Sequence, residues 1–243
     1  MIVDPQIFII FEPGMYGTFL CSLFTEHKLY KGSRSDRKYI GNEFIFNAHG
    51  SGYKDNLRQF HTHEDSVSLC QKNHTELLQF FQKLNGAGLG VHRLSSYYFT
   101  KIDFARYFKK FARIIVKPNA ERLEAYTERH SQTTASTHMS QWWATENFAG
   151  KDLTKVPDWF IQEMEKKELR KYLQVHTDFL NHNFTIDTKH DIEFDPDGII
   201  DQDSLKGMVD SVCSLLEIEN FELPFKEILT FTEKNKKFLY RKP

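Results

Sequence analysis

The sequence predicts a single α/β domain whose mainly parallel sheet is flanked by helices. Two observations favour this class: short apolar runs of strand length recur along the chain, and amphipathic runs of helix length fall between them. A length of 243 residues suits one such domain, and a hydrophobic content of 40% is enough for its core. We therefore expect one domain over residues 1–243.

Five runs are predicted to form the strands. The first is QIFIIF, residues 6–11, and the others cover 43–48, 89–93, 112–117 and 189–194. The second, third and fourth runs end in His49, His92-Arg93 and Lys117. Because ligands of parallel α/β sheets bind beyond the carboxyl ends of the strands, we expect these side chains to share one edge with the loop 12–18.

Helices are predicted between the strands from the spacing of apolar residues. Residues 17–27 carry Phe19, Leu20, Leu23 and Phe24 on one helical face. Further helices are expected over 74–85, 119–130, 157–183, 202–218 and 225–239. With the strands they complete the alternation that predicts a parallel sheet.

Composition excludes several function classes. Lys and Arg (32) nearly balance Asp and Glu (33), so a nucleic-acid partner is not expected. No stretch approaches the ~20 apolar residues that span a bilayer, and the apolar run near the amino terminus lacks the basic region of a signal peptide. Three widely spaced cysteines, Cys21, Cys70 and Cys213, indicate free thiols in a reducing compartment. We expect a soluble, cytoplasmic protein.

The loop EPGMYGT, residues 12–18, follows the first strand and leads into a helix. Unpaired amides at a helix start can hold an anion, Gly14 and Gly17 let the backbone approach it, and Thr18 adds a hydroxyl. The loop has no lysine or arginine, and it lacks the lysine directly before Ser or Thr that a Walker loop requires. From these residues alone, an ordinary strand-to-helix turn is an equal alternative.

Residues after the middle strands could also bind an anion. His92 could accept a proton from a hydroxyl, and Arg93 could hold a phosphate or a sulfate. Lys117 and Arg122 could grip an anion along the sheet edge. The alternatives are a structural histidine and, for Arg122, a surface pair with Glu121 or Glu124.

The order of these segments resembles the sulfotransferase family, which has a P-loop-like α/β fold. Its first loop, of the type P-x-(R/K)-S-G-T, corresponds to residues 13–18. A strand that carries the catalytic base corresponds to Val91-His92-Arg93, and the 3′-phosphate motif R-(D/N)-P-x-(D/E)-R-x-x-S-x-Y corresponds to VKPNAERLEAY, residues 116–126. The strand, acidic loop and helix near the end of the chain resemble the last part of that fold.

The resemblance implies transfer of a sulfuryl group from 3′-phosphoadenosine 5′-phosphosulfate to an acceptor hydroxyl of a small molecule or glycan, without a metal. It implies His92 as the base and donor-binding residues Gly14, Met15, Tyr16, Gly17, Thr18, Arg93, Lys117 and Arg122. The chain departs from the family where Met15 replaces the basic residue and Tyr16 and Ala125 replace serines. The alternative is therefore a non-catalytic protein of this fold that binds a ligand or a protein. A P-loop kinase or NTPase is disfavoured.

Three segments outside these motifs carry weaker signals. A helical insertion is expected at about 131–188, which matches no part of the family. His61 and His63 could ligate zinc, although a polar loop is the more ordinary interpretation. Trp142 and Trp143 could stack on an acceptor, or they could pack against a helix.

Overall fold

The computed structural model describes most of the predicted elements of the chain. Its described residues are 2–12, 15–24, 27, 29, 37–40, 43–46, 74–86, 90–94, 97–128, 131, 158–182 and 186–239. His49, Cys70, the His61–His63 pair and the Trp142–Trp143 pair lie outside these residues.

A four-stranded parallel sheet forms the centre of the fold. Its strands are β1 (Gln6–Phe11), β4 (Val91–Leu94), β5 (Phe111–Val116) and β6 (Asp191–Phe194). They lie in the order β4-β1-β5-β6, and each neighbouring pair is parallel. The predicted α/β class with a mainly parallel sheet is confirmed.

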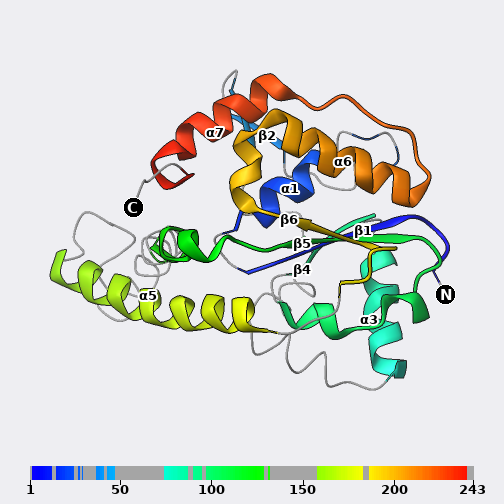
Figure 1. Ribbon diagram of the computed structural model, residues 1–243, viewed down its shortest axis with the longest axis horizontal. Coiled ribbons are helices and arrows are strands. Elements are labelled where there is room, and N and C mark those ends of the chain that lie inside the picture. Colours follow the sequence, from blue (N-terminus) through cyan, green and yellow to red (C-terminus); the bar gives the residue numbers. More distant parts are fainter. Residues whose placement is uncertain are drawn as a thin grey trace.

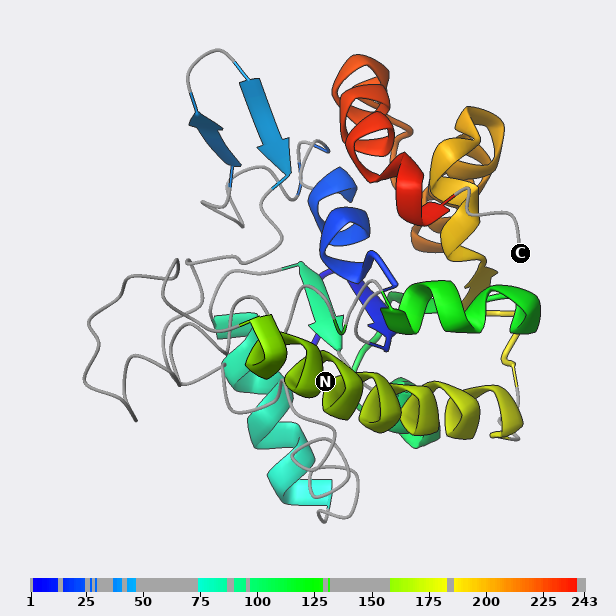
Figure 2. The same cartoon turned by 90° about the vertical axis from the view of Figure 1, so that its left-hand side faces the viewer.

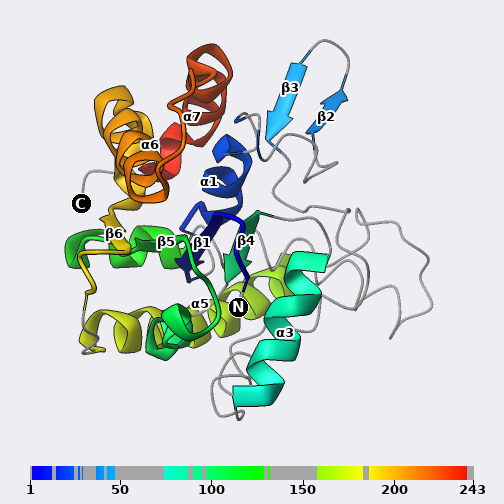
Figure 3. The ribbon, with the colours of Figure 1, turned by 90° about the vertical axis from the view of Figure 1, so that its right-hand side faces the viewer.

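Helices cover both faces of this sheet (Figures 1 and 3). One face carries α1 (Gly17–Phe24), α6 (Gln202–Leu216) and α7 (Phe225–Leu239), and the other carries α3 (His74–Gly86) and α5 (Asp158–Asn181). None of the helices in the described part of the chain is long and apolar enough to cross a membrane.

Two-sided burial explains why β1 is apolar from Ile7 to Phe11. Ile7, Ile9 and Phe11 pack into the core beneath α1 and α6, whereas Phe8 and Ile10 pack into a second core with Phe81 of α3. Because alternate side chains point to opposite faces, a strand covered on both faces must be apolar at every position. All six residues of β1 are buried.

The predicted strand at 43–48 does not belong to the parallel sheet, so this part of the prediction was wrong. Its counterpart, β3 (Glu43–Phe46), pairs in antiparallel fashion with β2 (Arg37–Ile40) in a separate sheet. Only two residues separate β2 from β3 in the sequence. That spacing suits a hairpin, whereas a parallel neighbour needs a crossover of a dozen or more residues.

A buried ion pair joins β5 to β6. Arg113 donates from Nε to Asp191 Oδ1 at 2.6 Å and from Nη2 to Oδ2 at 2.7 Å. Its Nη1 also donates to the carbonyl oxygens of Thr100 and Ile102, each at 3.3 Å. The carboxylate accepts in addition from the amide of Asp187 at 2.9 Å. Two charges can be buried together here because each has several hydrogen-bond partners.

Candidate functional site

The carboxyl ends of all four parallel strands meet at one edge of the sheet. Glu12 directly follows β1, Lys117 follows β5 and Asp195 follows β6. In Figure 2, viewed from the side at which the strands end, α5 and the helix 123–128 lie on the near side. The edge therefore collects loop residues from distant parts of the chain beneath two helices.

The loop after β1 turns its side chains into the core. Met15 is fully buried, and the buried ring of Tyr16 meets Phe231 of α7 edge-on, with 6.0 Å between ring centroids. The amide of Met15 donates to the carbonyl oxygen of Glu12 at 3.2 Å, which closes a turn. Gly14 lies outside the described residues. Of the two predicted donor residues Met15 and Tyr16, only backbone atoms could face a ligand.

Two backbone features shape the end of this loop. Tyr16 has a left-handed conformation with φ of 58°. A Cβ atom on Gly17 would lie 2.1 Å from Cδ1 of Phe11, so only glycine fits there without movement of that ring. Gly17 and Thr18 begin α1. The second predicted glycine is thus explained by packing against β1.

His92 and Arg93 do not end their strand, contrary to the prediction. They are the second and third residues of β4, which continues to Leu94, and they pair in register with Phe8 and Ile9 of β1. At about 3.3 Å per residue, the backbone of His92 therefore lies roughly 13 Å before that of Glu12 along the strands. The strand extends to Leu94, whose buried side chain packs in the second core with Phe81 of α3.

Lys117 and Arg122 reach the edge, but each has a carboxylate partner. Lys117 Nζ lies 3.9 Å from Glu193 Oε2, with both side chains partly exposed. Arg122, whose side chain is only 16% exposed, donates from Nε to Asp197 Oδ2 at 3.0 Å. The acceptor of this hydrogen bond is thus distant in the sequence and is neither Glu121 nor Glu124. The positive charge that a phosphate would meet is therefore partly offset.

More acidic groups surround Arg122. Burial raises the pKa of Asp195, and the charge of Asp197 raises it further, against lowering contributions from the amide of Asp197 and from Arg122. Burial also raises the pKa of Tyr126, and Asp197 adds to the effect. Tyr126 therefore remains a neutral phenol beside this pair.

Glu12 is the edge residue with the most unusual surroundings. Its side chain is fully buried, and Oε1 accepts from the amide of Tyr97 at 2.7 Å. Oε2 is buried and has no hydrogen-bond partner in the described part of the chain. Burial raises the pKa of Glu12 to about 8, although the hydrogen bond from Tyr97 opposes the shift. At neutral pH the carboxyl is therefore mostly protonated.

Aromatic residues of two elements lie around the Tyr97 amide that binds this carboxyl. Tyr97 starts the short helix η2 (Tyr97–Lys101), and its ring stacks on Phe179 of α5 with centroids 5.5 Å apart. The ring of His182, just after α5, lies 4.8 Å from that of Tyr97. Burial raises the pKa of Tyr172 to about 12, and the charges of Glu168 and Glu12 contribute. The charge of Glu12 therefore acts on a residue of α5.

A hydrogen-bond chain fixes α5 to the helix after β5. The Thr127 hydroxyl donates to the carbonyl oxygen of Leu123 at 2.7 Å and lies 2.8 Å from His176 Nδ1. Because a hydroxyl has one proton to donate, Nδ1 of His176 must donate to Thr127. Both side chains are buried, so this contact fixes the position of α5 over the strand ends.

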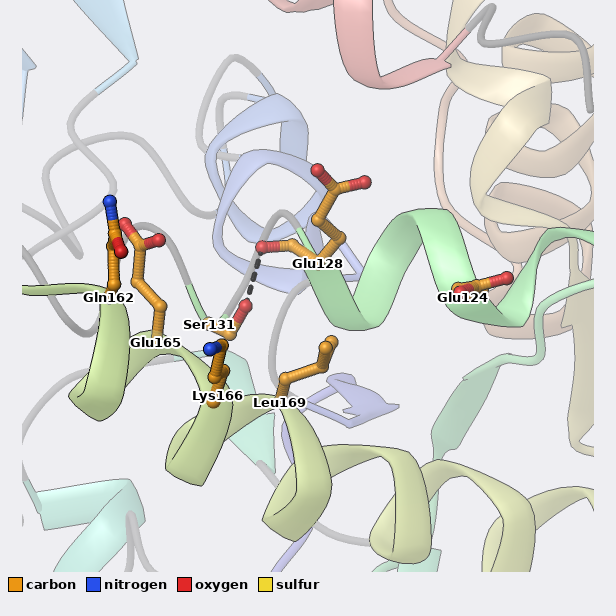
Figure 4. Close-up of a pocket in the computed structure, with 7 residues that line it drawn as sticks. All are labelled: Glu124, Glu128, Ser131, Gln162, Glu165, Lys166 and Leu169. Carbon is orange, nitrogen blue, oxygen red and sulfur yellow. Dashed lines mark hydrogen bonds between the residues drawn. The ribbon is translucent and has the colours of Figure 1, made fainter.

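A cavity of about 310 Å³ lies between this helix and α5 (Figure 4). The Ser131 hydroxyl in its wall donates to the carbonyl oxygen of Glu128 at 2.8 Å. The cavity combines polar and charged side chains with one leucine; its lining residues are Glu124, Glu128, Ser131, Gln162, Glu165, Lys166 and Leu169. Its described lining contains none of the predicted donor residues.

The unusual surroundings of Glu12 have one signal in the sequence. Glu12 directly follows five consecutive apolar residues at the end of a strand that is buried on both faces. A carboxyl in that position loses contact with water, which disfavours its charged form. A metal centre has less support: within the described ranges, no group of three His, Cys, Asp or Glu side chains could hold a metal ion.

Comparison with known proteins adds no family to this geometry. No family model, no curated protein and no solved structure matches the chain. What the site can do must therefore be inferred from its own residues.

Proposed function

We propose that this protein binds 3′-phosphoadenosine 5′-phosphosulfate at the carboxyl edge of its sheet and transfers the sulfuryl group to an acceptor hydroxyl, with a P-loop-like, sulfotransferase-like fold. The observation that supports this proposal is the strand order. β1 lies between β4 and β5, so the loop after β1 neighbours both the strand with His92 and Arg93 and the segment with Lys117 and Arg122. These are the three motifs on which the family resemblance depends.

The residues at the edge fit such a donor in part. Backbone amides at the start of α1, from Gly17 and Thr18, would hold the 5′-phosphosulfate, because they begin a helix and have no earlier carbonyl partner within it. Lys117 and Arg122 would hold the 3′-phosphate, which requires that the phosphate compete with Glu193 and Asp197 for them. An arginine suits this role because its fork of donors can serve two acceptors at once.

In the transfer, the acceptor oxygen bonds to sulfur while the bond from sulfur to the bridging oxygen breaks, leaving adenosine 3′,5′-bisphosphate. The contribution of the chain is to bind the donor, stabilise negative charge and remove the proton of the acceptor. His92 is the base that the resemblance implies. The cavity between α5 and the helix after β5 would receive a hydroxyl-bearing acceptor, such as a small molecule or glycan.

Calorimetry with adenosine 3′,5′-bisphosphate tests the donor site. We expect a Kd in the micromolar range, as is typical of cofactor sites. Arg122→Gln should weaken binding by about 10- to 100-fold, the equivalent of one charged hydrogen bond. A matched control is Arg106→Gln, because Arg106 is exposed, pairs with Asp103 at 3.0 Å and precedes β5. Absence of binding by the wild-type protein at millimolar ligand would refute the proposal.

A second candidate is a non-catalytic protein of the same fold that binds a ligand or a protein partner. It is favoured by the buried side chains of Met15 and Tyr16 and by the pairing of Arg122 with Asp197, each of which removes a donor contact. The two candidates differ in one measurement, which is sulfuryl transfer from the radiolabelled donor to a panel of hydroxyl acceptors. If His92 is the base, His92→Ala should abolish transfer and leave binding of the bisphosphate nearly intact.

A further inference from the structure

The outward face of α5 carries a hollow that the site described above does not use. Its volume is about 670 Å³, which is within the range of ligand sites. Figure 2 shows α5 on the near side of the molecule, and its inward face is anchored by the buried rings of Phe160, His176 and Phe179. The side chains that line the hollow all come from this helix and are exposed; they are Trp159, Gln162, Glu163, Lys166, Lys167 and Arg170.

Trp159 gives one end of this hollow an exposed aromatic ring. Its side chain is 62% exposed, whereas its neighbour Phe160 is buried and meets the indole edge-on, with 5.7 Å between ring centroids. Tryptophan is one of the residue types that contribute most to the energy of protein interfaces, because a partner can bury a large rigid surface. The ring is therefore available for contact with a partner.

Three cations form the other end of the hollow. Lys166, Lys167 and Arg170 are exposed, and no carboxylate within the described ranges pairs with any of them. Glu163 and Lys167 have the four-residue spacing that favours a helical ion pair, but they do not form one. The positive charge at this end is therefore available to an acidic partner.

The lining residues follow one another along the helix in a fixed order. At 1.5 Å per residue, Lys166 lies about 10 Å beyond Trp159 along the helix axis and Arg170 about 16 Å beyond it, with Glu163 between the indole and the cations. An extended peptide covers the same two lengths in about three and five residues. Because an exposed ion pair contributes little by itself, a ligand must contact several of these groups at once.

We propose that this hollow binds an extended acidic peptide segment of a protein partner, with an apolar residue on Trp159 and acidic residues on Lys166, Lys167 and Arg170. Glu163 favours a peptide over a polyanion with evenly spaced charges, because it repels any anion between the two ends. A single apolar residue on a concave surface does not suit a membrane. The inference does not depend on the sulfuryl transfer proposed above.

Fluorescence anisotropy of labelled hexapeptides tests the inference. The probe is Phe-Ser-Gly-Glu-Glu-Glu, used together with its reverse because either direction fits the helix. The comparison peptide, Phe-Glu-Glu-Glu-Ser-Gly, has the same composition and net charge but places anions beside Glu163. We expect a Kd on the order of 100 µM for the probe in one of its directions, and about fivefold weaker binding of the comparison peptide.

Substitutions along the helix separate the two ends of the hollow. Trp159→Ala should weaken binding of the probe about tenfold. Lys167→Gln combined with Arg170→Gln should weaken it about five- to tenfold and remove most of its dependence on salt. Glu163→Gln should bring the two peptides within about twofold of each other. Lys171→Gln, on an exposed cation of the same helix outside the hollow, is the matched control and should change the Kd less than twofold.

The outcomes separate a peptide from other occupants. Tighter binding of the probe than of the comparison peptide, with the losses given above, supports the inference. Equal affinity of the wild type for the two peptides, no binding at millimolar peptide, or wild-type affinity in Trp159→Ala overturns it. None of these results bears on the donor site, which calorimetry with the bisphosphate tests separately.

Three further ligands complete the test. Dextran sulfate represents a polyanionic glycan, and phosphatidylserine vesicles represent a membrane. If either binds and the Lys167 and Arg170 double variant loses it, while neither direction of the probe binds, the surface serves that class and the inference is overturned. The third is a second copy of the chain: a dimer in sedimentation velocity that Trp159→Ala dissociates would overturn it as well.

Discussion

Replacement of Glu12 by glutamine should change how the stability of the protein depends on pH. The carboxyl is fully buried, and its pKa rises from an ordinary value of 4.5 to about 8 in the folded chain. Between these two values the folded protein holds a proton that the unfolded chain has lost. Stability therefore falls as pH rises through this window, and the loss is complete above pH 8. Glutamine cannot ionise, so the variant lacks this contribution.

The magnitude follows from the size of the shift. Each pKa unit is worth 1.36 kcal/mol, so the full effect is of the order of ~5 kcal/mol. Over the practical range from pH 5 to pH 9, the wild type should lose ~4 kcal/mol of unfolding free energy relative to Glu12→Gln. The hydrogen bond from the Tyr97 amide can be kept by the glutamine oxygen, so the two proteins should be similarly stable near pH 5.

Urea unfolding at pH 5, 7 and 9 measures this difference directly. The two proteins should diverge steadily as pH rises, while Glu222→Gln, on an exposed carboxylate, follows the wild type. A difference between wild type and Glu12→Gln that is the same at all three pH values would show that Glu12 ionises normally. The reasoning from burial would then be refuted.

Four other substitutions test the packing, the buried ion pair and a helix cap. Gly17→Ala should destabilise the protein by ~1–3 kcal/mol because its Cβ would overlap the Phe11 ring. Gly207→Ala in α6, where a Cβ would meet nothing within 4 Å, should be neutral or stabilising. Thermal unfolding of the two variants measures this difference. Asp191→Asn leaves Arg113 buried without its counter-charge and should cost ~3–5 kcal/mol in urea unfolding, and a loss below 1 kcal/mol would contradict the buried pair. Asp201→Ala removes the side chain that accepts from the Asp203 amide at the start of α6, and a cost of ~1 kcal/mol is expected in the same assay.

Elements whose residues interact locally were predictable. β1 and α7 have the expected bounds, and α5 (Asp158–Asn181) lies within the stretch 157–183 that was predicted to be helical. Burial on both faces makes β1 apolar from Ile7 to Phe11, and the sequence shows this directly. The pairing of strands was harder to predict than the bounds of these elements. No strand was predicted at residues 37–40, so the antiparallel partner of β3 was missed, and the wider alternation of strands and helices favoured the parallel sheet.

The candidate site was less predictable because its chemistry depends on distant partners. Arg122 pairs with Asp197, which is 75 residues away in the sequence. The hydrogen bond from Tyr97 to Glu12 joins residues 85 apart, and α5 supplies Tyr172. Local sequence shows which side chains can ionise, but tertiary contacts decide whether a carboxyl is buried or a cation is already paired.

The central position of β1 has a consequence for how the chain folds during synthesis. β1 is synthesised before its partner strands, residues 91–94 and 111–116, so both of its edges stay unpaired until those segments leave the ribosome. Its sequence, QIFIIF, combines strong strand propensity with no charge and no proline, which is the composition of aggregation-prone segments. The strand that organises the finished sheet is therefore a part of the nascent chain that benefits from protection by chaperones.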